Sequence, residues 1–238
     1  TTPDLTFPAT ATTVQSKLGA NNAFAFDVQA VCSGFVYALT TADNFIQSGQ
    51  VKNALVIGAD ILSRIVDWKD RNTCVLFGDG AGAVVVQSTS EENSGIIASS
   101  LHSDGSLNDL LKTSGGTSSS QTAGFIEMSG RDVFKHAVEK MSKSVISTLE
   151  KANIDLSDID FLVPHQANAR ILSAVAKRLD LPAEKVIMTV ENHANTSAAS
   201  IPLALDKANS ENKFKKGDIL VLEALGGGLT WGSIVLKW

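Results

Sequence analysis

The 238-residue sequence predicts an α/β fold, and two observations support this. Short apolar runs, typical of buried strands, alternate with longer stretches of helical period. A pattern of strand, glycine-rich turn and strand also occurs twice, as ALVIGAD…FGDGAGAVVVQ and as ILVLEALGGGLTWGSIVLKW. Each copy follows a helix that opens after a strand. We therefore predict a duplicated α/β unit whose two helix starts lie near a pseudo-twofold axis.

The individual elements follow from local patterns. Strands are predicted where apolar and β-branched residues cluster between turn residues, at 23–28 (AFAFDV), 53–60, 81–87, 95–101, 158–163, 185–190, 218–225 and 231–238. Helices are predicted where apolar residues recur with helical period, at 32–48, 131–152, 168–180 and 197–210. Residues 113–124 (TSGGTSSSQTAG) are expected to form a loop that could act as a mobile flap.

Composition narrows the functional class. The sequence is 44% hydrophobic and 19% charged, which suits a globular protein with a large core. It has neither an apolar run long enough to cross a bilayer nor a signal peptide, so we expect a cytoplasmic protein. A net charge of −5 gives no general affinity for nucleic acid. Because the chain does not begin with Met, we expect a fragment or a processed piece.

Four strand ends carry residues that suit a site, because ligands of α/β proteins gather where strands end and helices begin. Cys32 opens a helix, where backbone N–H groups and the helix dipole lower the pKa of a thiol and favour the nucleophilic thiolate. His165 follows a strand in FLVPHQAN, and Asn195 follows another in VENHANTSAAS. The glycines at 226–228 allow a backbone amide to approach a ligand closely.

Each feature also has a simpler structural interpretation. A single cysteine at such a junction is more often a buried thiol, and we expect this of Cys74 in TCVLFGDGAG. The two cysteines lack CxxC spacing, so free thiols are expected rather than a disulfide or a zinc site. His102, His136 and His193 are expected to be surface or hydrogen-bonded histidines. The coincidence of a nucleophile, a base, an amide donor and a glycine-rich loop nevertheless favours catalysis.

The chain contains, in this order, DVQAVCSGFVYAL, ALVIGADILSR, FGDGAGAVVV, LHSDGS, VPHQANARI, NHANTSAASIPLALD and EALGGGLTWGS. These stretches resemble the thiolase-fold condensing enzymes, and within them the β-ketoacyl-acyl-carrier-protein synthase III family. The resemblance implies a five-layered αβαβα fold with two pseudo-repeated halves. Family members begin with a further segment that this chain lacks, so we expect residues 1–88 to be the remainder of an incomplete N-terminal half carrying the nucleophile. Residues 89–238 would form the C-terminal half carrying the histidine and the asparagine.

The resemblance implies a catalytic triad of Cys32, His165 and Asn195, with the backbone amides of Cys32 and Gly227 as the oxyanion hole. Elongating synthases use two histidines and thiolases a second cysteine, so Asn195 favours the initiating enzyme. The implied reaction is the decarboxylative Claisen condensation of acetyl-CoA with malonyl-acyl carrier protein. It proceeds through an acyl-cysteine and yields acetoacetyl-acyl carrier protein, CoA and CO2. No cofactor and no metal is expected.

The resemblance also implies substrate and partner contacts. The substrate-binding residues would be Phe7, Arg71, Gly130, Phe134, Asn168 and Leu225. Phe7 would cross the interface of a homodimer to close the acyl pocket, and Arg71 would stack on the adenine of CoA. Acidic acyl carrier protein would dock on Arg170, Lys177 and Arg178, although a solvated basic helix face explains these charges equally well.

Three other functions remain open from the sequence. The chain could be a related condensing enzyme of secondary metabolism. It could be a Cys-His-Asn thioester hydrolase, which releases free acid and needs no malonyl partner. It could also be an inactive thiolase-fold fragment that serves as a binding module.

Overall fold

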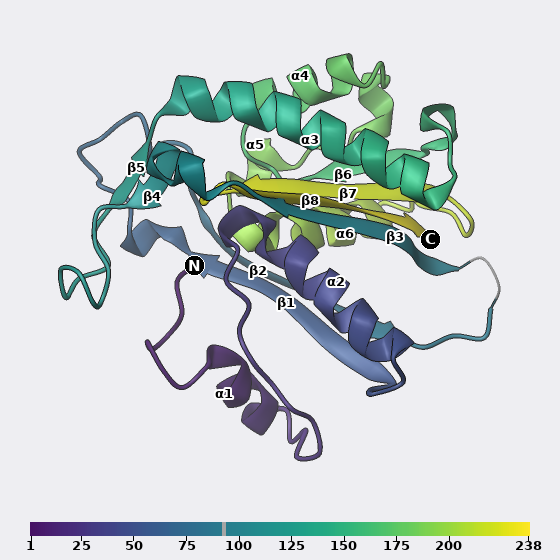
Figure 1. Ribbon diagram of the computed structural model, residues 1–238, viewed down its shortest axis with the longest axis horizontal. Coiled ribbons are helices and arrows are strands. Elements are labelled where there is room, and N and C mark those ends of the chain that lie inside the picture. The colour runs from purple at the N-terminus through teal and green to yellow at the C-terminus, as the bar shows by residue number, and fades with distance from the viewer. Residues whose placement is uncertain (92–93) are drawn as a thin grey trace.

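The structure is a computed structural model that describes residues 1–91 and 94–238. The described residues form four stacked layers, with helices and sheets alternating (Figure 1). The first layer holds α3 (Gly130–Ala152) and α4 (Ala169–Arg178), and the third holds α2 (Gly34–Gln47) and α6 (Ser200–Ser210). The layers of helix, sheet, helix and sheet agree with the predicted α/β class.

The second layer is a four-stranded sheet in the order β3-β8-β7-β6. Its strands are β3 (Gly95–Ser103), β8 (Thr230–Lys237), β7 (Ile219–Gly226) and β6 (Phe161–Pro164). β8 pairs antiparallel with both β3 and β7, and β6 runs parallel to β7. Parallel strands need a crossover connection, and the segment from β6 to β7 supplies it through α4 and α6.

The fourth layer is an antiparallel pair of β1 (Asn53–Ile61) and β2 (Asp79–Gln87). Gly58 lies opposite Gly82 in this pair, and a Cβ atom on Gly58 would sit 2.1 Å from the carbonyl oxygen of Ala198. The absent side chain therefore lets the segment before α6 pack directly on the sheet. The repeated strand–turn–strand pattern of the sequence corresponds to this pair and to β7–β8.

Two hydrophobic clusters hold the layers together. The first lies between the sheets and includes Phe35 of α2, Ile201 of α6 and Leu222 of β7. The second lies between the four-stranded sheet and the helices above it, and includes Met141 of α3 and Val175 of α4. Alternate residues of β7 enter the two clusters because side chains alternate across a strand, so this sheet is buried on both faces.

Two predicted strands are wrong. Residues 23–28 have no regular structure, and Asp27 instead accepts hydrogen bonds from the backbone amides of Thr10 and Ala11 at the start of α1 (Thr10–Lys17). An apolar run becomes a strand only beside a hydrogen-bonding neighbour, and no described strand lies against it. Residues 185–190 make a single bridge, Leu162 to Val186, before the chain turns into α5 (Val190–His193).

The sequence analysis missed the short elements. These are α1, α5 and the small antiparallel pair β4 (Leu111–Thr113) and β5 (Ile126–Met128). The segment between β4 and β5 contains the predicted serine- and glycine-rich loop, and it has no helix or strand beyond Thr113. Its role as a flap stays a prediction.

Candidate active site

Cys32, His165 and Asn195 line a single cavity of about 1050 Å³. Cys32 is more than a hundred residues from the other two in sequence, and the fold brings the three together. Only His165 follows a strand, β6, since the strands predicted before Cys32 and Asn195 are absent. Five further predicted residues line the same cavity, namely Gly130, Phe134, Asn168, Arg170 and Leu225. The cavity is therefore the candidate active site.

Cys32 lies in a 3-10 turn, Val31–Ser33, that leads directly into α2. The C-terminal strands hold this turn in place. The hydroxyl groups of Ser33 and Thr230 are 2.7 Å apart, and that of Thr230 also donates to the carbonyl of Ala30 at 3.0 Å. A Cβ atom on Gly226 would lie 2.7 Å from the amide nitrogen of Cys32. Only glycine fits here, so β7 ends directly against the turn that carries Cys32.

The pKa of Cys32 corrects the sequence-based argument. We expected the start of a helix to lower it, whereas burial of the side chain raises the pKa to about 12. The nearby Ser197 side chain favours the thiolate, but the cost of moving a negative charge away from water is larger, and the negative charge of Asp60 adds to it. Cys32 is therefore a neutral thiol at pH 7.

His165 follows β6, and its backbone amide donates to the carbonyl of Glu223 on the neighbouring strand at 2.7 Å. Its Nδ1 lies 2.7 Å from the hydroxyl of Ser200 in the first turn of α6. Burial lowers the pKa of the imidazole to about 4, so the ring is neutral at pH 7. Because a hydroxyl can donate or accept, Ser200 fixes the ring in either tautomer and leaves Nε2 for the cavity.

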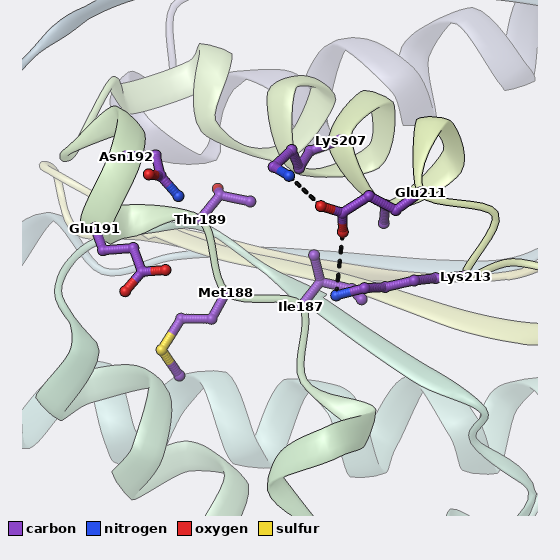
Figure 2. Close-up of a pocket in the computed structure, with 9 residues that line it drawn as sticks. Ile187, Met188, Thr189, Glu191, Asn192, Lys207, Glu211 and Lys213 are labelled. Atoms are coloured by element: carbon purple, nitrogen blue, oxygen red, sulfur yellow. Dashed lines mark hydrogen bonds and ion pairs between the residues drawn. The ribbon is translucent and has the colours of Figure 1, made fainter.

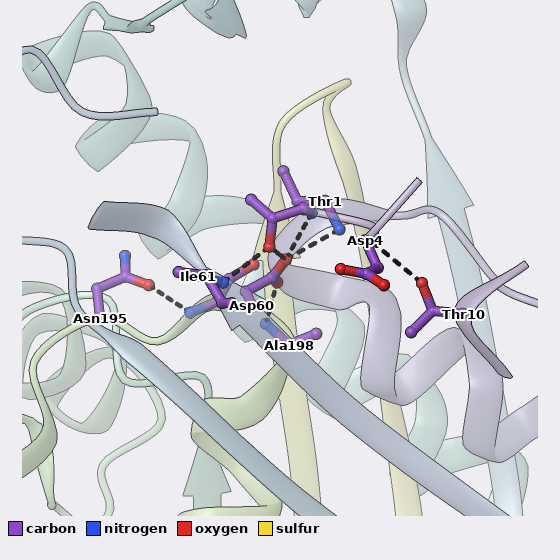
Figure 3. Close-up of polar contacts among 9 residues, drawn as sticks. Thr1, Asp4, Thr10, Asp60, Ile61, Asn195 and Ala198 are labelled. Atoms are coloured by element: carbon purple, nitrogen blue, oxygen red, sulfur yellow. Dashed lines mark hydrogen bonds and ion pairs between the residues drawn. The ribbon is translucent and has the colours of Figure 1, made fainter. Parts of the chain in front are cut away.

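Asn195 is fixed by its backbone and by its side-chain oxygen. Its amide donates to the carbonyl of Leu76, and its carbonyl accepts from the amide of Gly78, both at 2.9 Å. The Oδ1 atom accepts a hydrogen bond from the amide of Ser197 at 3.0 Å (Figure 3). That donor assigns the oxygen end of the side chain, and the Nδ2 group is left to donate.

Asp60, at the end of β1, supports the turn that follows Asn195 (Figure 3). Its carboxylate accepts from the amide of Ala198 at 3.4 Å and from the amide and hydroxyl of Thr2 at 3.0 Å each. The amino group of Thr1 lies 2.9 Å from the same carboxylate. The buried carboxylate of Asp60 thus has several partners, and through it β1 contacts the segment that follows Asn195.

A second buried acid, Glu223, lies on β7 beside the site. Its side chain is fully buried, and neither carboxyl oxygen has a hydrogen-bond partner among the described residues. Burial raises its pKa to about 8. The carboxyl group is therefore mostly protonated at pH 7 and places little negative charge near His165.

Five predicted site residues lie outside the cavity lining, and four of them are exposed or lie on the last turn of α4. Phe7 is 82% exposed, and Arg71 is also exposed, although its neighbours Asp70 and Asn72 line the cavity. Lys177 and Arg178 occupy the last turn of α4, at the opposite end of this helix from Arg170. Their roles stay predictions.

Gly227 also lies outside the lining, but it packs against the wall. A Cβ atom there would lie 2.7 Å from the carbonyl oxygen of the cavity residue Leu111. Its role in an oxyanion hole stays a prediction.

Other residues of the site were not predicted from the sequence. Ser200, which orients His165, occurs in the quoted NTSAAS stretch but was not singled out. Arg131, Ala137 and Met141 line the cavity from α3. Together with the predicted Phe134 they recur at helical spacing, so the period of this helix contained the signal.

A smaller hollow of about 150 Å³ lies beside α6 and holds none of the three predicted catalytic residues (Figure 2). Glu211 forms ion pairs there with Lys207 and, at 3.4 Å, with Lys213. These charges are half-exposed and satisfy one another, so the hollow offers no comparable chemistry. No helix in residues 1–91 or 94–238 is long and apolar enough to cross a membrane.

Comparison with known proteins places the chain in a family. Two family models match it, described as 3-oxoacyl-[acyl-carrier-protein (ACP)] synthase III over residues 26–105 and as its C-terminal part over residues 149–238. The β-ketoacyl-[acyl-carrier-protein] synthase III of Ehrlichia canis (strain Jake) is 62% identical over 237 residues, which cover 100% of this chain and 74% of that protein. The enzyme of the same name from Wolbachia pipientis wMel is 62% identical over 239 residues, with the same coverage.

Solved structures agree with the sequence matches. The 3-oxoacyl-[acyl-carrier-protein] synthase III of Aquifex aeolicus VF5 superposes with a TM-score of 0.94 at 49% identity, over 99% of this chain and 74% of that one. The enzyme from Pseudomonas aeruginosa PAO1 gives a TM-score of 0.95 at 44% identity, over 100% and 74%. The predicted thiolase-like fold is confirmed, and the chain belongs to the 3-oxoacyl-[acyl-carrier-protein] synthase III family of condensing enzymes.

Proposed function

We propose that this chain catalyses the initiating condensation of fatty acid synthesis, in which acetyl-CoA and malonyl-acyl carrier protein give acetoacetyl-acyl carrier protein, CoA and CO2. The observation that carries the proposal is the single cavity lined by Cys32, His165 and Asn195. It combines a buried thiol, a neutral imidazole and an amide donor. The names of the relatives support the same acyl transfer.

In the first step, the sulfur of Cys32 attacks the thioester carbon of acetyl-CoA. Because the thiol has a raised pKa, the proton must leave as the new bond forms, and neutral His165 is the base that shares the cavity. The bond to the CoA sulfur then breaks, and CoA takes up the proton. The backbone amides of Cys32 and Gly227 would stabilise the oxyanion, with Gly226 keeping the two segments in contact.

In the second step, malonyl-carrier protein loses CO2 as the bond to its carboxylate breaks. The electron pair forms an enolate, whose oxygen accepts hydrogen bonds from the Asn195 amide and from His165 in its other neutral tautomer, which carries the proton on Nε2 while Nδ1 accepts from the Ser200 hydroxyl. Neutral donors held by Ser200 and Ser197 stabilise this charge well in a buried site. The enolate carbon attacks the acetyl group, the bond to Cys32 breaks, and the thiolate recovers a proton from water.

Labelling with radioactive acetyl-CoA tests the assignment. The Cys32→Ala protein should carry no label, whereas Cys74→Ala, which removes the other free cysteine, should label like the wild type. His165→Ala and Asn195→Ala should lose malonyl decarboxylation, and Asn195→Ala should still accept the acetyl group. Label on the Cys32→Ala protein would refute the mechanism. Free acetate as the main product would favour the hydrolase alternative.

The assembly and location are part of the same proposal. We propose a homodimer in which Phe7, which is 82% exposed in the single chain, reaches the acyl pocket of the partner and limits primer size. Phe7→Thr should then broaden the use of branched acyl-CoA, and unchanged primer preference would contradict this role.

Both cysteines are free, which suits the reducing cytoplasm as the location.

We also retain Arg71 as a proposed contact of the CoA adenine. It is exposed beside the cavity residues Asp70 and Asn72, so a nucleotide at the entrance could reach its guanidinium. Acyl carrier protein would bind on α4, through Lys177 and Arg178 in its last turn and Arg170 at the cavity end. No cofactor or metal takes part in either step as proposed.

A further inference from the structure

One face of α3 lines the cavity from its buried interior to its exposed edge. Met141 is 2% exposed, Phe134 is 37% exposed, and Arg131 at the start of the helix is fully in the exposed class. These residues recur at helical spacing and so share a face. The cavity wall formed by α3 is therefore apolar at its buried end, aromatic in the middle and cationic at its exposed edge.

Within the described part of the chain, the guanidinium of Arg131 has no ion-pair partner. None of the ion pairs among residues 1–91 and 94–238 includes Arg131, nor Arg170 of the adjacent α4, which also lines the cavity. The one carboxylate of the lining, Asp70, accepts hydrogen bonds from Asn72 and Thr73 within its own turn. The entrance therefore carries excess positive charge in a chain of net charge −5.

The spacing along α3 suits an extended ligand. Met141 lies ten positions after Arg131, which corresponds to about 15 Å at the rise of an α-helix. A pantetheine thioester has a long, mostly neutral arm with the reactive sulfur at one end and a phosphate at the other. Such an arm could place its thioester among the buried residues while its phosphate stays at the entrance beside Arg131.

We propose that Arg131 binds the phosphate attached to the pantetheine arm of the acyl donor, so that it selects phosphopantetheine thioesters over unphosphorylated ones. The proposal rests on the proposed function, and it names the group that the site recognises at its entrance. Arginine suits this role because its planar guanidinium donates two parallel hydrogen bonds to a phosphate. The same phosphate occurs in CoA and in the prosthetic arm of the carrier protein.

The test measures acetylation of Cys32 by three donors: acetyl-CoA, acetyl-phosphopantetheine and acetyl-pantetheine. In Arg131→Gln, selectivity for each phosphorylated donor over acetyl-pantetheine should fall roughly tenfold, mainly through KM. Arg131→Lys should recover part of the loss. Lys135→Gln removes a positive charge from the exposed side of the same helix, outside the cavity lining, and should keep wild-type selectivity.

Two results would overturn the proposal. Unchanged selectivity in Arg131→Gln would show that the guanidinium does not contact the donor. A loss confined to acetyl-CoA, with acetyl-phosphopantetheine unaffected, would place the contact on the nucleotide instead of the pantetheine phosphate. Failure of the proposed function is distinguishable from both, because the wild-type protein would then accept no acetyl group from acetyl-CoA.

Discussion

The two sheets of this protein differ in what covers them. The four-stranded sheet is buried on both faces, by α3 and α4 above and by α2 and α6 below. The β1–β2 sheet is covered on the side of α2 and α6 only, and its other face exposes Leu55, Ile57, Ile61 and Val85 to between 38% and 69%. The strands of both sheets are rich in apolar residues, but only those of the four-stranded sheet are packed against helices on both faces.

The difference bears on how the site is held. His165 follows β6 of the doubly covered sheet, whereas Asn195 is hydrogen-bonded to Leu76 and Gly78, which precede β2 of the singly covered sheet. The turn that carries Cys32 contacts the four-stranded sheet through Gly226 and Thr230. We infer that the four-stranded sheet is the frame on which Cys32 and His165 are positioned.

The largest expected effect compares one residue type on the two sheets. Ile234 of β8 is fully buried, so Ile234→Ala should lower the free energy of unfolding by about 4 kcal/mol. Ile57 of β1 is 38% exposed on the outer face, so Ile57→Ala should cost about 1 kcal/mol or less. Urea denaturation measures both. Equal losses would show that the outer face of β1–β2 is buried in solution.

A second prediction concerns the pH dependence of the buried region. The folded-state pKa of His165 is lowered from 6.5 to about 4, so the folded protein binds fewer protons than the unfolded chain between these values. Stability from this group is present above pH 6.5 and is lost as the pH falls toward 4, by up to about 3 kcal/mol.

The variant His165→Gln isolates this contribution. Its free energy of unfolding should fall less than that of the wild type between pH 6.5 and pH 4. Other groups, including Glu223 with its raised pKa, titrate in both proteins and cancel in the difference. Parallel pH profiles would mean that the imidazole is not buried as a neutral group.

A third prediction tests the frame directly at the nucleophile. A methyl group on Gly226 would lie 2.7 Å from the amide of Cys32 and 2.9 Å from the carbonyl of Ala30, so Gly226→Ala should displace the turn. We expect the rate of Cys32 acetylation to fall about a hundredfold. Gly105→Ala, where nothing lies within 4 Å, is the matched control. Retained acetylation would show that the position of the turn does not depend on its contact with β7.

The smallest expected effect concerns α4, which covers the outer face of the four-stranded sheet. Replacing both Lys177 and Arg178 by Gln should raise the KM for malonyl-carrier protein about threefold at low salt and less at high salt. The KM for malonyl-CoA should stay constant. Lys215→Gln, an exposed lysine away from α4, controls for net charge. A KM for malonyl-carrier protein that does not change with salt would indicate that Lys177 and Arg178 are solvated charges that do not bind the carrier protein.

The sequence predicted the strongly periodic elements well. The helices at α2, α3, α4 and α6 and the strands β1, β2, β3, β7 and β8 lie close to their expected ranges, because their apolar residues repeat with a clear period. Residues 23–28 failed because a strand depends on a hydrogen-bonding neighbour that local pattern cannot supply. The division at residues 88 and 89 into two halves stays a prediction.

The sequence indicated which residues line the candidate site, but not their hydrogen-bond partners or protonation states. Motifs around Cys32, His165 and Asn195 pointed to these residues, and the structure places all three on one cavity. The partners that orient them, Ser200 and Ser197, come from one segment whose contacts arise only on folding.

The sequence by itself determined which residues could react and the order of the elements that carry them, since both are written in residue types and their spacing. Only the tertiary structure decided the protonation of those residues. A helix start favours a thiolate, yet burial raises the pKa of Cys32 to about 12, and burial lowers that of His165 to about 4. The physical reason is that desolvation depends on the atoms packed around a group from every layer, whereas sequence position describes only its neighbours along the chain.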